Sequence, residues 1–321
     1  MLTTRFTELV GCARPLQLAG MPGVVTPNLA CAVADAGGLA MLPAAGLPAA
    51  LLVHAMEEVA ARSGAPFGVN FLVPFLDEES LRAAASRAKV IEFFYGSPDA
   101  ALVDIVHSAG ALACWQVGST TEAVAAAEAG CDLIVVQGIE AGGHVRGEVG
   151  LFPLLGQVLD VVGVPLLAAG GIATARSMAA AIAAGASGVR VGTRLVASAE
   201  SGAHPAYVDA LLRARAEDTV LTEAFSVMWP DAPHRVLRSC VEAAQRFDGG
   251  VVGETVVAGQ AMPIPRLAVP VPTRDTTGCI EAMALYAGQS VNGVERIDEA
   301  GVIVRELCDG AESLLRRDAF R

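Results

Sequence analysis

The sequence predicts an α/β protein built as a (β/α)8 TIM barrel, with a smaller, mainly helical insertion near the barrel mouth. Three observations predict this fold. Between residues 15 and 193, short β-rich runs alternate with longer Ala-rich segments; several segments end in Ala-Gly just before the next run; and a chain of 321 residues with 53% apolar composition can bury a large core. An open doubly wound sheet is the alternative, but eight units in unbroken succession favour the barrel.

Eight short β-rich runs are the expected strands. They span residues 16–20, 38–42, 67–71, 90–94, 111–117, 132–137, 165–170 and 188–192. The recurring helix, stop and strand between them require parallel strands joined by right-handed crossovers. The sequence therefore predicts that all eight strands end at the same mouth.

Capping residues mark the helices between these runs. One helix has Thr26 as N-cap, Pro27 at its first position and Gly37 as its stop, and another is capped by Ser119 or Thr120. Three later helices end in Ala-Gly, at 109–110, 129–130 and 184–185. Each of these stops directly precedes an expected strand.

The regular alternation stops after residue 199, which suggests three parts. Residues 1–199 form the expected barrel and 200–264 an insertion that shapes the substrate pocket. Residues 265–321, with the run "TGCIEAMALYAGQSV" and a charged C-terminal helix, return to the barrel wall.

Charge and composition point to a small-molecule substrate. The net charge is −12 and no basic cluster occurs, which argues against nucleic acid or an anionic membrane as the partner. No apolar run reaches the roughly 18 residues of a membrane span, and the N-terminus lacks a secretory h-region, so we expect a cytoplasmic protein. The seven cysteines show no metal-ligand spacing, and we expect no metal. A homodimer is left open.

Polar residues and glycines follow the expected strands on the mouth side, where such barrels carry their active sites. The first strand ends at Gly20 and Met21, the third at Asn70, the fifth at Gln116 and the sixth at Gln137. If a flavin is bound, the three amides can hydrogen-bond the carbonyl and imide edges of its ring. These residues form the expected floor of the site.

Two glycine turns at the last two strands predict a phosphate site. Gly170 and Gly171 precede a helix capped by Thr174, and Gly192 and Thr193 precede another. Loops 7 and 8 are the usual phosphate site of this fold, although tight turns alone are the alternative. The single lysine, Lys89, precedes the fourth strand at the opposite end of the barrel, which argues against Schiff-base chemistry.

His144 is the candidate catalytic residue. It lies in the loop after the sixth strand, and Gly142 and Gly143 would let the chain pass close to a flat ring and place the imidazole beside it. An imidazole with its ordinary pKa of about 6.5 can take a proton from an acidic carbon near neutral pH.

Other polar and aromatic residues near this loop have weaker claims. Glu140 either orients the imidazole or caps a loop amide, and Arg176 is a weak candidate for phosphate contact. Met228 and Trp229 either line the roof of the pocket or pack in the core. The other histidines, His54, His107, His204 and His234, are interpreted as structural.

Several ordered motifs resemble the nitronate monooxygenases, formerly called 2-nitropropane dioxygenases. They are "QLAGMPGVVTPNLACAVADAGGLAML", "FGVNF", "VVQGIEAGGH", "AAGGIATARSMAAAIAAGASGVRVGTR" and "AMALYAGQSV". The resemblance implies an FMN-dependent barrel that oxidises alkyl nitronates, and by extension nitroalkanes, with O2 to a carbonyl compound and nitrite. It implies catalysis by His144 and FMN binding by Met21, Asn70, Gln137, Gly142, Gly171, Gly192 and Thr193.

Two other functions remain open. A similar Gly-Gly-His loop occurs in flavin-dependent enoyl-acyl-carrier-protein reductases and related NAD(P)H-quinone reductases, which reduce enoyl thioesters or quinones. The sequence has no G-x-G-x-x-G after a strand, which tilts against a dedicated NAD(P)H domain. A third hypothesis is a flavin-binding protein without catalytic turnover, which predicts that altering His144 has no functional effect.

Overall fold

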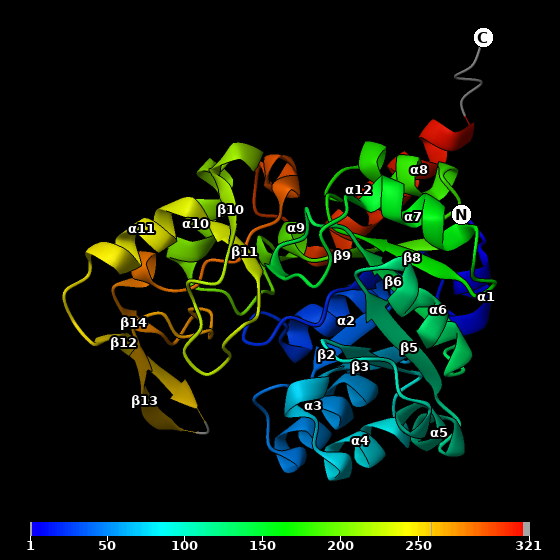
Figure 1. Cartoon of the computed structure of the whole chain (residues 1–321), viewed down its shortest axis with the longest axis horizontal. Helices are drawn as coiled ribbons and strands as arrows, with labels where there is room; N and C mark the ends of the chain where they lie inside the picture. Colours follow the sequence, from blue (N-terminus) through cyan, green and yellow to red (C-terminus); the bar gives the residue numbers. More distant parts are fainter. Residues whose placement is uncertain (1, 258, 317–321) are drawn as a thin grey trace.

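The barrel dominates the computed structural model, which describes residues 2–257 and 259–316 (Figure 1). Its eight parallel strands are adjacent in the order β1-β9-β8-β6-β5-β4-β3-β2. Leu39 closes the ring, because its N–H donates to Leu16 O at 2.8 Å and its carbonyl accepts from Leu18 N at 2.9 Å. The strands are β1 (Leu16–Leu18), β2 (Ala40–Pro43), β3 (Phe67–Leu72), β4 (Val90–Phe94), β5 (Leu112–Val117), β6 (Leu133–Gln137), β8 (Leu166–Ala169) and β9 (Gly188–Val191). The predicted barrel and its eight strands are confirmed.

Helices cover the outside of the barrel and begin at the predicted caps. Thr26, Ser119 and Thr174 accept hydrogen bonds from backbone amides three residues on. Thr193, expected ahead of its helix, is instead the first residue of the short α9. The helices are α2 (Pro27–Asp35), α3 (Ala49–Arg62), α4 (Glu78–Ala85), α5 (Ala100–Ser108), α6 (Thr120–Glu128), α7 (Leu151–Leu159), α8 (Ala175–Ala183), α9 (Thr193–Val196) and α12 (Ala300–Arg316).

The barrel interior is apolar at one end and polar at the other. Helix α1 (Arg5–Val10) inserts Phe6 and Val10 among Met41, Val90 and Leu133. Phe6 also lies against Gly188, the first residue of β9, so α1 closes the end where the strands begin. Access to the interior is therefore from the carboxyl ends of the strands.

A smaller region is appended beside the mouth (Figure 1). It contains two α-helices but also two three-stranded antiparallel sheets, β10-β11-β7 and β13-β12-β14, so the region that the sequence predicts to be mainly helical is in fact mixed α/β. Val- and Thr-rich runs that sequence periodicity did not resolve form these short strands. The elements are α10 (Pro205–Arg213), β10 (Thr219–Thr222), β11 (His234–Leu237), α11 (Arg238–Arg246), β12 (Val251–Val257), β13 (Gln260–Pro265), β14 (Thr277–Gly278) and, from the barrel, β7 (Gly143–His144).

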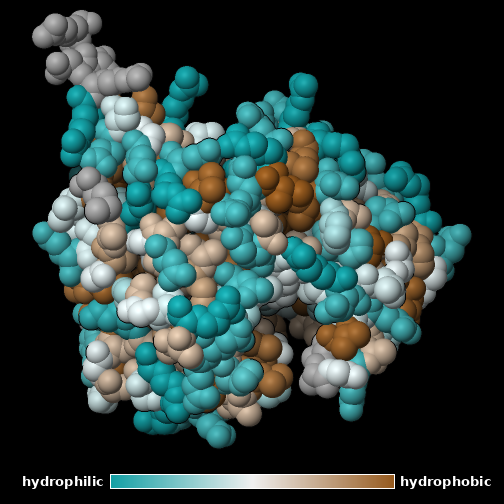
Figure 2. All heavy atoms as spheres, turned by 180° about the vertical axis from the view of Figure 1, so that it is seen from behind, coloured by the Kyte–Doolittle hydropathy of each residue, from teal (hydrophilic) through white to brown (hydrophobic). Residues whose placement is uncertain are grey.

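The chain leaves the appended region later than residue 264, the boundary expected from the sequence. Strand β14 pairs with β12, and Tyr286 bridges to Val236 of β11. Only then does the chain return to α12, which packs on α2 and α8. Figure 2 shows the opposite face as mainly hydrophilic, with apolar side chains in separate patches and a hollow between the β12–β13 hairpin and the barrel. No helix among the described residues is long and apolar enough to cross a membrane.

Candidate active site

The loop after β6 brings His144 to the mouth and fixes its backbone from two sides. Gly143 and His144 form β7, in which His144 pairs with His234 and Gly143 with Arg235 of β11. From the barrel side, Gln137 Nε2 donates to the carbonyl oxygen of His144 at 3.0 Å. The histidine is therefore held between the end of a barrel strand and the sheet of the appended region.

The glycines of this loop serve close backbone approach. A Cβ on Gly142 would lie 2.4 Å from Gly288 N and 2.7 Å from Ala287 C, so only glycine fits there. Gly143 has a φ of 77°. The backbone that Gly142 meets is the segment after residue 286, which is pinned to the loop where Gln289 N donates to Glu140 O at 2.9 Å. The flexible-looking loop is thus tightly packed.

The imidazole of His144 lies in an aromatic cluster. Trp229 stacks on it with ring centroids 4.0 Å apart and an interplanar angle of 24°. Tyr95 presents an edge contact at 5.8 Å, Tyr286 lies at 5.6 Å and His234 at 5.3 Å. Within the described part of the chain, the buried Nε2 of His144 has no hydrogen-bond partner. Burial, with a smaller contribution from His234, lowers the pKa of His144 to about 3, so the ring is neutral at pH 7.

The neighbouring His234 is occupied by structural hydrogen bonds. Its Nδ1 lies 2.8 Å from Ala232 O, and its Nε2 accepts from Phe225 N at 3.3 Å. This pairing assigns the proton to Nδ1 and leaves neither nitrogen free for a substrate. Burial lowers the pKa of His234 as well. The structural interpretation of this residue agrees with its geometry.

Glu140 caps a loop amide, one of the two roles left open by the sequence. Both of its carboxylate oxygens lie 3.0 Å from Leu151 N at the start of α7. The carboxylate thus stabilises a helix N-terminus, where negative charge is favoured. The imidazole of His144 is oriented by other means.

The barrel interior below the mouth contains a buried polar network that sequence reasoning missed. Glu92 of β4 is fully buried and accepts hydrogen bonds from Gln17 Nε2 at 3.0 Å, Asn70 Nδ2 at 2.7 Å and Arg190 Nη1 at 2.5 Å. Arg190 also donates to Gln116 Oε1. Two predicted cofactor-binding residues, Asn70 and Gln116, are therefore held by a buried ion pair. The signal was present: Gln17, Glu92 and Arg190 are single polar residues inside apolar strands.

The predicted glycine turns, which follow β8 and β9, lie next to other residues predicted to bind the cofactor. Gly170 and Gly171 have φ values of 95° and 70°. A Cβ on Gly192 would lie 3.5 Å from Met21 Sδ, and one on Gly20 would lie 2.6 Å from Asn70 Cβ. Thr193 Oγ1 accepts from Gly288 N at 3.1 Å, which joins the loop after β9 to the segment packed on the loop after β6. Arg176, the weak phosphate candidate, is exposed.

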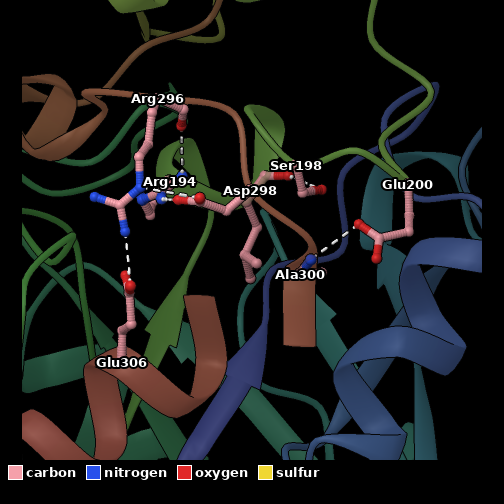
Figure 3. A network of polar contacts seen from close by, with 8 residues as sticks. Arg194, Ser198, Glu200, Arg296, Asp298, Ala300 and Glu306 are labelled. Carbon is pink, nitrogen blue, oxygen red and sulfur yellow. Dashed lines mark hydrogen bonds and ion pairs between the residues drawn. The ribbon is translucent and has the colours of Figure 1, made fainter. Parts of the chain in front are cut away.

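An ion-pair network holds α9, the short helix after β9, in place (Figure 3). Arg194 of α9 is buried and donates to Asp298 Oδ2 at 2.6 Å, and Arg296 Nε donates to the other carboxylate oxygen at 2.9 Å. Glu306 of α12 pairs with Arg296 at 2.6 Å. The segment leading into α12 therefore fixes the helix that begins at Thr193.

A groove opens on the mouth side beside Trp229. It has a volume of about 300 Å³ and lies between the segments that follow β2 and β3, with Leu47, Phe71 and Phe75 among its apolar walls. Phe75 makes an edge contact with Trp229 at 5.0 Å between ring centroids. Trp229 is 8% exposed whereas Met228 is 66% exposed, so the indole is buried between Phe75 and His144 while its neighbour faces solvent.

These features define a barrel enzyme whose site lies at the carboxyl ends of the strands and is completed by an appended region. Comparisons with known proteins show that it is an oxidoreductase. The chain belongs to the nitronate monooxygenase family, whose model matches residues 3–85 and 76–310.

Two curated relatives illustrate the range of this similarity. A (3aS,4S,5R,7aS)-5-hydroxy-7a-methyl-1-oxo-octahydro-1H-indene-4-carboxyl-CoA dehydrogenase of Mycobacterium tuberculosis is 36% identical over 253 residues, covering 78% of this chain and 69% of the relative. A probable nitronate monooxygenase of Staphylococcus aureus is 31% identical over 269 residues, covering 69% and 76%.

Two solved structures share the whole architecture. FabK from Thermotoga maritima superposes with a TM-score of 0.83 at 29% identity, covering 99% of this chain and 98% of that one. Nitroalkane oxidase from Streptomyces ansochromogenes gives a TM-score of 0.78 at 27% identity, covering 97% and 100%. The fold is thus the TIM barrel of these proteins, with the appended region included.

Proposed function

We propose that this protein is an FMN-dependent nitronate monooxygenase that oxidises alkyl nitronates with O2 to a carbonyl compound and nitrite. The observation that carries the proposal is the neutral imidazole of His144 at the mouth, whose Nε2 has no partner in residues 2–257 and 259–316, in a chain of the nitronate monooxygenase family. A neutral imidazole presents no proton that would convert a nitronate back to the nitroalkane. When a neutral nitroalkane is the substrate, the nitronate anion formed by its deprotonation would stabilise the protonated ring.

The residues at the mouth fit a flavin. Gln17 Oε1 and Gln137 Oε1 are buried acceptors that lack a partner among residues 2–257 and 259–316, and a ring N–H could satisfy such an atom. Gly20 lets Asn70 pack directly against the backbone at the end of β1, since a Cβ there would lie 2.6 Å from Asn70 Cβ. The loops after β8 and β9 offer backbone amides and a helix start to a phosphate. When bound, FMN would supply the electron-accepting ring and the reaction with O2.

His144 would act on the substrate proton and would be dispensable for a substrate that is already a carbanion. We expect the His144→Asn variant, with FMN bound, to lose turnover of neutral nitroalkanes far more than turnover of preformed nitronates. Equal loss of both activities would contradict the assignment of His144 as a base. The FMN absorbance spectrum of the variant serves as the control for an intact site.

A reductase is the second candidate, because the FabK structure superposes on this chain and a CoA dehydrogenase is among its relatives. The flavin-loaded protein is mixed without oxygen with NADH, NADPH and an alkyl nitronate in separate experiments. Loss of flavin absorbance with the nitronate alone supports the monooxygenase. Rapid loss with NADH or NADPH supports a reductase of enoyl thioesters or quinones instead.

A further inference from the structure

The indole of Trp229 has the shortest centroid distance among the ring contacts of His144. The two rings are nearly parallel, 4.0 Å apart and tilted by 24°, whereas Tyr95, Tyr286 and His234 meet the imidazole at steeper angles and larger distances. Tyr95 in turn makes an edge contact with Trp229 at 4.6 Å. The orientation of the imidazole plane is therefore set by ring packing.

No hydrogen bond from the residues that the structure describes sets this orientation. The nearby carboxylate, Glu140, is engaged with Leu151 N, and Gln137 holds only the backbone of His144. In many enzymes a carboxylate or carbonyl bonded to one ring nitrogen fixes the catalytic histidine and also stabilises its charged form. The described residues offer His144 a stacked indole in that place.

We propose that Trp229 is the positioning residue of His144: its indole fixes the plane of the imidazole and shields one face of the ring from solvent. This inference rests on the proposed role of His144. The shielding follows from the stacking of the buried indole on His144 and from the edge contacts with Phe75 and Tyr95 that hold the indole in place.

The backbone of residues 228–231 suits this task. Met228 and Asp231, on either side of Trp229 and Pro230, have φ values of 81° and 54°. Residues other than glycine adopt this left-handed backbone conformation only where the surrounding structure holds them in it. The segment therefore presents the indole in one orientation, at a cost in backbone strain.

The charged groups around the aromatic cluster do not determine the orientation of the His144 imidazole. The guanidinium of Arg146 lies 5.5 Å from the Tyr95 ring and is paired with Glu122 at 2.5 Å, so its charge is compensated. Glu223 acts electrostatically on Tyr95 and His234. The pKa of Tyr95 is raised to about 12 and that of Tyr286 is also raised, chiefly by burial, so neither phenol ionises near neutrality.

A titration of His144 by NMR tests the proposal without reference to turnover. In the flavin-loaded full-length protein, with the signal assigned through His144→Asn, we expect no titration of His144 between pH 5 and 8. In Trp229→Ala the stacked indole no longer shields the ring from solvent, so the pKa of His144 rises toward its ordinary value and the signal titrates in that range. Trp229→Phe, which keeps a flat ring, should behave like the wild type.

Activity provides the second readout. Trp229→Leu fills the space without a flat ring, so the His144 signal should still not titrate between pH 5 and 8. Turnover of a neutral nitroalkane should fall roughly tenfold because the imidazole is misoriented, whereas nitronate turnover should persist. Loss of nitroalkane turnover in Trp229→Phe equal to that in Trp229→Leu would overturn the proposal, as would a His144 that stays silent in Trp229→Ala. A wild type without nitronate turnover would reject the proposed function but leave the titration result in force.

Discussion

Replacing Glu92 by Gln tests whether the buried network holds the barrel interior together. Glu92 is fully buried, and Arg190 is 8% exposed. The substitution keeps the side-chain volume but leaves Arg190 without a counter-charge, and breaking a buried ion pair costs about 3–5 kcal/mol. The four groups that contact the carboxylate, from Gln17, Asn70, Arg190 and the Cys114 thiol, are all donors. A Gln amide offers one acceptor oxygen and brings donors of its own, so at least one partner is left unsatisfied.

Urea unfolding measures the effect. A loss of about 4 kcal/mol, at a slope of roughly 3 kcal/mol per molar, lowers the midpoint by about 1 M or more. The double variant Glu92→Gln with Arg190→Met should recover part of the loss, because it removes the uncompensated charge. Glu57→Gln on the exposed side of α3 is the control. A midpoint for Glu92→Gln equal to that of the control would refute the reasoning.

Three further predictions concern the loops and the imidazole. Asp298→Ala leaves the buried Arg194 unpaired, so we expect a loss of about 2 kcal/mol in unfolding free energy and weaker FMN binding, measured by urea unfolding and flavin titration. Gly142→Ala places a Cβ 2.4 Å from Gly288 N, so we expect a loss of about 1–3 kcal/mol and reduced nitronate kcat/KM. His144, with its pKa lowered to about 3, makes the unfolding free energy fall as the pH drops from about 6.5 to 3, because the unfolded imidazole binds its proton first.

Matched variants separate these effects from general damage. Glu306→Ala removes only an exposed partner of Arg296 and should change stability by less than about 1 kcal/mol. Gly163→Ala, whose Cβ would meet nothing within 4 Å, should be neutral. His144→Asn should make the acid loss of stability shallower. An unchanged pH dependence in that variant would contradict the assigned direction of the pKa shift.

The sequence was sufficient for the features that depend on local patterns. The strands, the N-caps at Thr26 and Thr174 and the loop carrying His144 follow from short runs, capping residues and glycine placement. The network around Glu92 could not be derived in this way, because its partners lie 22, 75 and 98 residues away along the chain and meet only when the barrel closes.

The residues around His144 could not be predicted from the sequence for the same reason. Trp229 reaches the histidine through a turn with two left-handed residues, Met228 and Asp231, which no periodicity signals. The pairing of β7 with β11 joins residues 90 positions apart, His144 and His234. A two-residue strand has too little sequence to be recognised on its own, so the loop looked free where it is in fact paired.

The pairing of β7 with β11 places His144 under the control of two parts of the chain. By sequence it belongs to the barrel, and by hydrogen bonding it is the edge of a sheet in the appended region. A one-residue slip of β11 would turn every side chain of the pair to the opposite face. Insertions and deletions in the appended region can thus change the direction of the His144 side chain while the barrel stays unaltered, so substrate preference can change through substitutions far from this residue. Excision of that region would leave a barrel without an aligned histidine.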